Sequence, residues 1–124
     1  MAKYSVLVVD DDKSVYEQLN GMLDSEKYVL VYSDSVKEAK ERIDSHNYDV
    51  IFLDLILPGS SGLDILEYLK MVVENKPKII LVTSYSAPEM EMMAIEMGAI
   101  ACIFKPLEAD KVLDVLHKYL EKKD

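Results

Sequence analysis

The stretch Val6-Leu7-Val8-Val9-Asp10-Asp11 decides the fold, because four apolar residues lead directly into two carboxylates. Four more short apolar runs follow along the chain: Tyr28–Tyr32, Val50–Leu53, Ile79–Val82 and Ala101–Phe104. Nearly continuous apolar runs of this length are typical of parallel strands that are covered on both faces. The sequence therefore predicts a five-stranded parallel sheet.

Amphipathic stretches with helical spacing separate the runs. Their apolar positions are Val15, Leu19, Met22 and Leu23; Val36, Ala39 and Ile43; Leu63, Leu66 and Leu69; Met90, Met93, Ala94 and Met97; and Val112, Leu113, Leu116, Tyr119 and Leu120. Three serine–glutamate pairs fit the capping box, namely Ser14 with Glu17, Ser35 with Glu38 and Ser86 with Glu89, and Gly98 is placed to end the fourth helix. The alternation predicts an α/β fold: a flavodoxin-like, doubly wound (βα)5 sheet of strand order 2-1-3-4-5 with helices on both faces.

Size and charge narrow the class of protein. The 124 residues predict a single domain over residues 1–124, and the composition, 50% hydrophobic and 30% charged, is globular. With 14 Lys and Arg against 23 Asp and Glu, the net charge of −9 argues against direct nucleic-acid binding. One cysteine and two histidines argue against a disulfide and a zinc site. No signal peptide or membrane-spanning run is evident, so we expect a cytoplasmic protein with no membrane contact.

Polar residues stand at the predicted carboxyl ends of the strands, where open α/β sheets bind ligands. Asp10 and Asp11 follow the first strand, Asp54 the third, Thr83 the fourth and Lys105 the fifth. Adjacent strands are about 4.8 Å apart, so Asp10, Asp11 and Thr83 should flank Asp54, and a lysine is long enough to reach it from two strands away.

Three converging carboxylates require a positive partner. Carboxylate oxygens are hard ligands that suit Mg²⁺, with Mn²⁺ as the alternative. Such an ion, a lysine and a hydroxyl together form a clamp for phosphoryl oxygens, and one carboxylate can then act as the nucleophile.

These residues resemble the response regulator receiver domain of two-component signalling, in particular its stand-alone chemotaxis and sporulation-relay type. The resemblance covers Tyr4 to Leu120. It rests on the order and spacing of Asp10-Asp11, Asp54-Leu-Ile-Leu-Pro58 with Gly62, Thr83-Ser84, Gly98-Ala99 and Lys105-Pro106.

The resemblance implies a role for each residue of the pattern. Asp54 is the expected phosphoacceptor, and Asp11, Asp54 and the backbone carbonyl of Ile56 are the expected Mg²⁺ ligands. Asp10 would support the metal directly or through water. Thr83 and Lys105 would contact phosphoryl oxygens.

Two further expectations concern the flanks of this pattern. The Lys105–Pro106 bond is expected to be cis, an isomer that X–Pro bonds permit at modest cost. Asp12 is expected to be a solvated residue that opens the first helix.

One position departs from the family. Receivers usually have Tyr or Phe three residues before the conserved lysine, and here that residue is Cys102. We expect Cys102 to be a small, buried apolar residue, with Phe104 or Tyr85 taking part of the switching role. Met92 lies off the apolar stripe of its helix and is expected to be exposed.

The resemblance also implies partners. A histidine kinase or a histidine phosphotransfer protein would donate the phosphoryl group. A conformational shift would follow in the face formed by the Met90–Met97 stretch, the Ala101–Phe104 run and the Val112–Leu120 stretch. That face would dock a downstream target or a second receiver. The chain would be a monomer, or a dimer when phosphorylated, and a phosphoacceptor that assists its own phosphorylation and dephosphorylation, not an enzyme.

Three alternatives remain at this point. A stand-alone receiver is favoured over a fragment of a larger regulator or hybrid kinase. Asp10-x-Asp12-x-Ser14 imitates the nucleophile motif of haloacid-dehalogenase-type phosphatases, but only Asp110 and Asp114 follow the lysine, where that family needs an acidic pair. A nucleotide-binding flavodoxin-like or Rossmann module would need a glycine-rich phosphate loop, which the sequence lacks.

Overall fold

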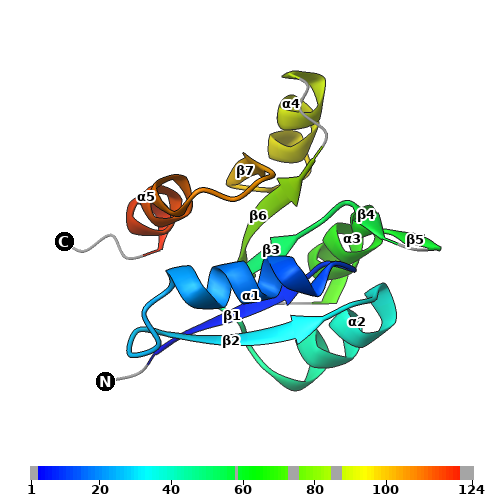
Figure 1. Cartoon of the computed structure of the whole chain (residues 1–124). Coiled ribbons are helices and arrows are strands. Elements are labelled where there is room, and N and C mark those ends of the chain that lie inside the picture. The colour runs from blue at the N-terminus through cyan, green and yellow to red at the C-terminus, as the bar shows by residue number, and fades with distance from the viewer. Residues whose placement is uncertain (1–2, 58, 73–75, 85–87, 121–124) are drawn as a thin grey trace.

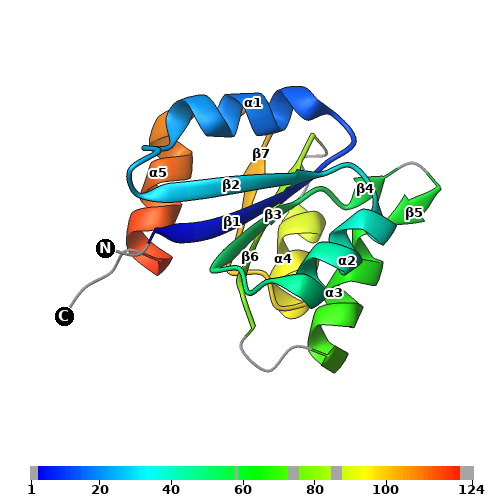
Figure 2. The ribbon, with the colours of Figure 1, turned by 90° about the horizontal axis from the view of Figure 1, so that it is seen from below.

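A five-stranded parallel sheet forms the middle layer of the molecule, with helices on both faces (Figures 1 and 2). The structure, a computed structural model, describes residues 3–57, 59–72, 76–84 and 88–120. The strands of the sheet are β1 (Tyr4–Val9), β2 (Tyr28–Ser33), β3 (Val50–Leu53), β6 (Lys78–Thr83) and β7 (Ala101–Phe104). They lie in the order β2-β1-β3-β6-β7, so the predicted order 2-1-3-4-5 is confirmed.

The helices divide between the two faces of the sheet. They are α1 (Lys13–Met22), α2 (Val36–Ser45), α3 (Gly62–Val72), α4 (Pro88–Glu96) and α5 (Ala109–Tyr119). Figure 2 shows α1 and α5 on one face and α2, α3 and α4 on the other. Successive side chains of β3 point to opposite faces of the sheet. Val50 and Phe52 pack into the hydrophobic cluster on the face covered by α1 and α5, which we call the α1–α5 cluster. Ile51 and Leu53 pack into the cluster on the face covered by α2, α3 and α4, which we call the α2–α4 cluster.

Two of the expected helix signals are confirmed. The Ser35 hydroxyl accepts a hydrogen bond of 3.1 Å from the backbone N–H of Glu38 and caps α2. Gly98 follows α4 with a φ of 106°, and the N–H groups of Gly98 and Ala99 donate to the carbonyls of Ile95 and Ala94, both at 3.0 Å. This is the glycine-closed helix end that the sequence predicts.

The predicted capping box of Ser14 and Glu17 is wrong. α1 begins at Lys13, and its cap is Asp12, whose carboxylate accepts the N–H of Ser14 at 3.0 Å. Aspartate caps as well as serine does, and Asp12 comes two residues earlier, at the point where the chain leaves β1. The third pair, Ser86 with Glu89, includes Ser86, which lies outside the described residues.

A short antiparallel hairpin was not expected. It consists of β4 (Ile56–Leu57) and β5 (Ser60–Ser61), and it lies between β3 and α3. Directly after it, Gly62 lies against the backbone of Asp54, where an added Cβ would be 2.4 Å from the carbonyl oxygen of Asp54. The glycine therefore lets the start of α3 contact the end of β3.

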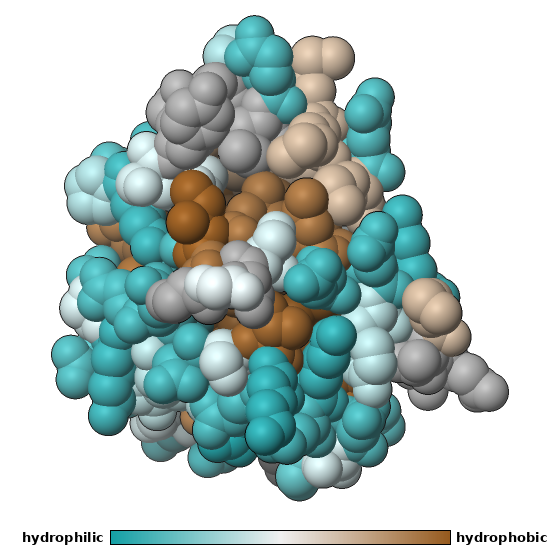
Figure 3. Space-filling view, turned by 90° about the vertical axis from the view of Figure 1, so that its right-hand side faces the viewer, coloured by the Kyte–Doolittle hydropathy of each residue, from teal (hydrophilic) through white to brown (hydrophobic). Residues whose placement is uncertain are grey.

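Figure 3 views the edge of the molecule toward which the strand arrows of Figure 1 point, with hydrophobic residues near its middle and hydrophilic residues around them. Ile56, which follows the end of β3, has 64% of its surface exposed. Among the described residues, no helix has the length and apolar character needed to span a membrane.

Candidate functional site

Asp10 and Asp11 lie where β1 ends, at the edge of the sheet expected from the sequence. Asp10 is buried and Asp11 is exposed. The N–H of Asp10 donates to the carbonyl of Ser33 at 3.1 Å, and its Oδ1 accepts the N–H of Asp12 at 2.9 Å. Asp12 itself is exposed and opens α1, as expected. The two aspartates at the end of β1 therefore differ in burial, and only Asp11 offers an exposed carboxylate.

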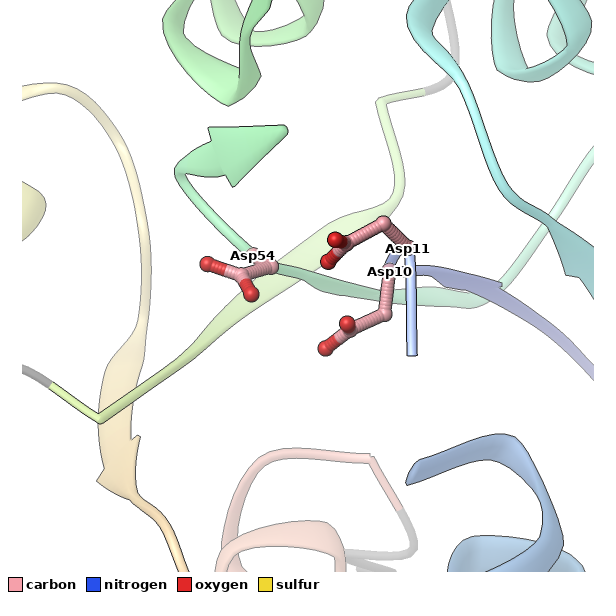
Figure 4. Close-up of side chains that lie close together, drawn as sticks. All are labelled: Asp10, Asp11 and Asp54. Carbon is pink, nitrogen blue, oxygen red and sulfur yellow. The ribbon is translucent and has the colours of Figure 1, made fainter. Parts of the chain in front are cut away.

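Asp54 lies at the end of β3, the neighbouring strand. Its N–H donates to the carbonyl of Val9 at 3.0 Å, and its Oδ1 accepts the N–H of Ile56 at 2.9 Å. Asp10, Asp11 and Asp54 each offer a carboxylate oxygen within 4.8 Å of the other two, as Figure 4 illustrates. We call these three residues the carboxylate cluster.

Lys105 reaches the cluster from the edge strand β7. Its Nζ lies 3.0 Å from Oδ2 of Asp10 and 3.2 Å from Oδ2 of Asp54. The reach across two strands that the sequence predicts is therefore present. The Lys105–Pro106 peptide bond is cis, as the resemblance implied.

The charges in this site act on one another. Burial raises the pKa of Asp10, although hydrogen bonds from the Asp12 backbone and from Lys105 oppose the shift. Burial alone would lower the pKa of Lys105, but its hydrogen bond and charge interaction with Asp10, followed by those with Asp54, raise it overall. Lys105 is therefore a firmly protonated cation.

The donor set fits a hard divalent cation. Three carboxylates and one ammonium leave the site with a surplus of two negative charges. Oδ2 of Asp10 is buried, and the Lys105 ammonium 3.0 Å away is shared with Asp54, whose Oδ2 lies 3.2 Å from the same nitrogen. Buried anionic oxygens that lack full compensation are costly, and a magnesium ion with oxygen ligands would compensate them.

Thr83 completes the group of residues predicted at the strand ends. It is the last residue of β6, is fully buried, and pairs in register with Phe104 of β7. The N–H of Lys105 donates to its carbonyl at 2.8 Å. Cys102 and Phe104 are half-buried, and Cys102 packs against the α2–α4 cluster. Tyr85 lies outside the described residues.

Sequence reasoning missed one contact in this region. The hydroxyl of Tyr32 in β2 donates to the backbone carbonyl of Asp10 at 2.8 Å. A tyrosine in an apolar strand carries no site signal in sequence. The register of β2 against β1, which pairs Val8 with Tyr32, is what brings it to this position.

The comparisons with known proteins agree with this geometry. The family model of the response regulator receiver domain matches residues 6–117 of this chain. Sporulation initiation phosphotransferase F of Bacillus subtilis is 29% identical over 99% of this chain and 98% of its own length. Sensory transduction protein LytT of Bacillus anthracis is 32% identical over 95% of this chain, which spans only 48% of that protein.

Solved structures give the same result. A CheY-like receiver domain protein of Methanospirillum hungatei has a TM-score of 0.85 at 25% identity, covering 97% of this chain and 95% of that one. The beryllofluoride-activated receiver domain dimer of NtrC4 has a TM-score of 0.85 at 26% identity, covering 94% of this chain and 96% of that one.

These matches decide against the phosphatase and the nucleotide-binding module as alternatives. Receiver domains are generally phosphoacceptors and not enzymes. Some relatives are longer than this chain. Protein-glutamate methylesterase/protein-glutamine glutaminase 1 of Caulobacter vibrioides is 31% identical over 98% of this chain, which spans only 36% of that protein. Fold, site and comparisons lead to one conclusion: the chain belongs to the response regulator receiver domain family of two-component signalling.

Proposed function

We propose that Asp54 accepts a phosphoryl group from a phosphohistidine of a histidine kinase or of a histidine phosphotransfer protein. The observation that carries the proposal is the position of its carboxylate. It lies at the end of a central strand, within 4.8 Å of two other carboxylates and 3.2 Å from Lys105. A nucleophilic carboxylate needs this combination of neighbouring charges, because phosphoryl transfer depends mainly on positioning and electrostatics.

The transfer exchanges one bond for another. A carboxylate oxygen of Asp54 attacks the phosphorus in line, and an O–P bond forms as the P–N bond breaks. The imidazole leaves with the electron pair of that bond. The same chain would also assist hydrolysis of the acyl phosphate, in which water attacks the phosphorus, the P–O bond to Asp54 breaks, and the carboxylate leaves with the electron pair as inorganic phosphate is released.

The ligands of the expected metal are Asp10, Asp11, Asp54 and the backbone carbonyl of Ile56. Bound there, Mg²⁺ or Mn²⁺ would neutralise the surplus charge of the carboxylate cluster and of the phosphoryl oxygens. The ammonium of Lys105 would bind one phosphoryl oxygen, and the hydroxyl of Thr83 would donate to another.

The decisive experiment is phosphorylation by a small phosphodonor, followed by intact mass. The protein should gain one base-labile phosphate in the presence of Mg²⁺ and none without it. Asp54→Asn should gain none. Asp64→Asn, the same substitution at an exposed aspartate of α3, is the matched control and should behave as wild type. A phosphate retained by Asp54→Asn would overturn the assignment.

The phosphodonor would approach the edge shown in Figure 3. Ile56 of β4, two residues after Asp54, is exposed, and hydrophobic residues gather near the middle of this edge. A kinase or phosphotransfer domain would cover this apolar surface during transfer. We place the exchange in the cytoplasm, and we propose that residues 1–124 form one receiver domain without direct contacts to nucleic acid or membrane.

The response would pass to the face formed by α4, β7 and α5. A cavity of about 670 Å³ lies there, which we call the edge groove. Met92 (65% exposed), Ile95 (51%) and Tyr119 (37%) line it together with Cys102. The exposure predicted for Met92 is therefore confirmed, and three large apolar side chains share one exposed groove.

The border of the edge groove is acidic. Glu91, Glu96 and Asp114 line it, with Lys118 as the basic residue among them. A downstream target with an apolar side chain flanked by basic residues would match this border. A second copy of the receiver is the other proposed occupant, with the protein monomeric before phosphorylation and dimeric after it.

Switching would begin at Thr83. Its register partner in β7 is Phe104, and Cys102, two residues earlier, lies on the same side of that strand. We propose that Phe104 or Tyr85 takes part of the role of the missing aromatic residue. Thr83→Ala should still be phosphorylated at Asp54 but should lose the phosphorylation-dependent amide shifts of β7 and α4. Unchanged shifts in this variant would contradict the route through Thr83.

A further inference from the structure

Tyr32 lies close to the carboxylate cluster, although it belongs to neither of the strands that supply the cluster. It is the second-last residue of β2, an edge strand of the sheet. Its ring is half-buried and packs against that of Tyr16 with 5.4 Å between ring centroids. Its hydroxyl donates to the backbone carbonyl of Asp10 at 2.8 Å. The ring is thus fixed by packing and the hydroxyl by a hydrogen bond.

The backbone hydrogen bonds show why this contact matters. The peptide between Val9 and Asp10 is held on both sides, since the Val9 carbonyl accepts from Asp54 and the Asp10 N–H donates to Ser33. The ladder between β1 and β2 ends at Val9 and Ser33. The next peptide joins Asp10 to Asp11 and lies beyond the ladder. There the Tyr32 hydroxyl takes the place of a strand partner.

That peptide sets the direction of Asp11. The carbonyl of Asp10 and the N–H of Asp11 belong to one rigid plane, so a hydrogen bond to the carbonyl restricts the position of the Asp11 Cα. Asp11 is the exposed member of the carboxylate cluster and has the least packing to hold it.

We propose that Tyr32 is a positioning residue for the metal site: its hydroxyl orients the Asp10–Asp11 peptide and thereby preorganises Asp11 toward Asp10 and Asp54. This inference rests on the proposed function, because it assumes that the cluster binds Mg²⁺. A group that orients a metal ligand through one hydrogen bond contributes to affinity without touching the ion. Loss of one neutral hydrogen bond should weaken Mg²⁺ binding about three- to tenfold.

The test is a titration of the full chain with Mg²⁺ alone, monitored through the amide resonances of Asp10, Asp11 and Asp54. Tyr32→Phe removes only the hydroxyl. Tyr28→Phe is the matched control, because Tyr28 lies on the same strand and no hydrogen-bond partner of its buried hydroxyl is found among the described residues. Thermal unfolding without Mg²⁺ is measured for both variants.

We expect Tyr32→Phe to bind Mg²⁺ about three- to tenfold more weakly with the Asp11 amide displaced before metal is added. Tyr28→Phe should bind as wild type. Wild-type affinity in Tyr32→Phe overturns the inference, and so does an equal loss in both variants. If wild type binds Mg²⁺ and is phosphorylated, such a result leaves the proposed function intact. If wild type shows no Mg²⁺-dependent shift at the three aspartates, both proposals fail.

Discussion

Asp54 and Lys105 meet at 3.2 Å, yet the parts of the molecule that supply them are packed very differently. All four residues of the central strand β3 are buried, whereas β7 at the edge has Ile103 as its single buried residue. The helices follow the same division. α2 buries Val36, Ala39 and Ile43, while Ala94 is the one buried residue among the described side chains of α4.

Under the proposed function, the difference in packing separates two tasks. A carboxylate that receives a phosphoryl group must keep its position relative to the other ligands, and the fully buried β3 gives it that rigidity. A lysine that reports the phosphoryl group must pass a change outward, and β7 with α4 has few buried contacts to break. Few buried apolar contacts are characteristic of the segments that move in proteins.

The prediction with the largest expected effect tests this division by replacing an isoleucine with alanine in each of the two parts. Ile51→Ala in β3, where the side chain is fully buried, should lower the free energy of unfolding by about 2–5 kcal/mol. Ile95→Ala in α4, where 51% is exposed, should change it by less than about 0.5 kcal/mol. Urea unfolding measures both. Similar losses in the two variants would show that the edge is packed as tightly as the centre.

The next effect concerns the contact behind Asp54. Gly62→Ala would bring a Cβ to 2.4 Å from the Asp54 carbonyl oxygen and 2.9 Å from the Cα of Leu55, both of them backbone atoms that cannot easily shift. We expect a loss of about 1–3 kcal/mol in stability together with slower phosphorylation. Gly21→Ala is the control, since its Cβ would meet nothing within 4 Å and helix propensity favours alanine by about 0.5–1 kcal/mol. Two variants of equal stability would contradict this account of Gly62.

A smaller effect concerns the metal. With free Mg²⁺ at ten times its dissociation constant, binding should stabilise wild type by about 1.4 kcal/mol. Asp11→Asn removes one ligand charge and should lose most of this gain. Hydrogen exchange should slow mainly at the ends of β1 and β3 and much less in α4. Protection spread evenly over α4 would show that the two parts are coupled before phosphorylation.

The smallest effect is a chemical one at the edge. Burial, followed by the charge of Glu91, raises the pKa of the Cys102 thiol. Because the thiolate is the reactive form, alkylation by iodoacetamide at pH 8 should be slower in the folded protein than in urea, and should accelerate as the pH rises toward the raised pKa. Mass spectrometry follows the modification. Equal rates in folded and unfolded protein would mean that the edge groove leaves Cys102 as reactive as a free thiol.

The sheet and the position of the site were accessible from sequence, because both depend on local patterns. Apolar runs marked the strands, and the polar residues that follow them marked the edge at which a ligand binds. Asp10, Asp54, Thr83 and Lys105 lie at the strand ends where the sequence predicted them.

The features that were missed depend on geometry that sequence does not encode locally. The sequence offers both Asp12 and Ser14 as capping residues at the start of α1, and the exit of the chain from β1 decides for Asp12. The β4–β5 hairpin is too short to form a pattern. The approach of Gly62 to Asp54 and the reach of Tyr32 to Asp10 follow from how elements pack, which no single stretch of sequence contains.

The closed end of α4 has a mechanical consequence. Gly98 and Ala99 tie the last turn to the chain that enters β7, Ala99 is buried, and the N–H of Ile100 donates to Ile79 of β6 at 2.8 Å. We therefore expect this end of the helix to act as a pivot. At 1.5 Å per residue, α4 is a lever about 13 Å long, and a tilt about the pivot moves the opposite end most. That end begins at Pro88, five residues after Thr83 in the sequence, so a small push from Thr83 would be converted into a rotation of the side chains along the edge groove.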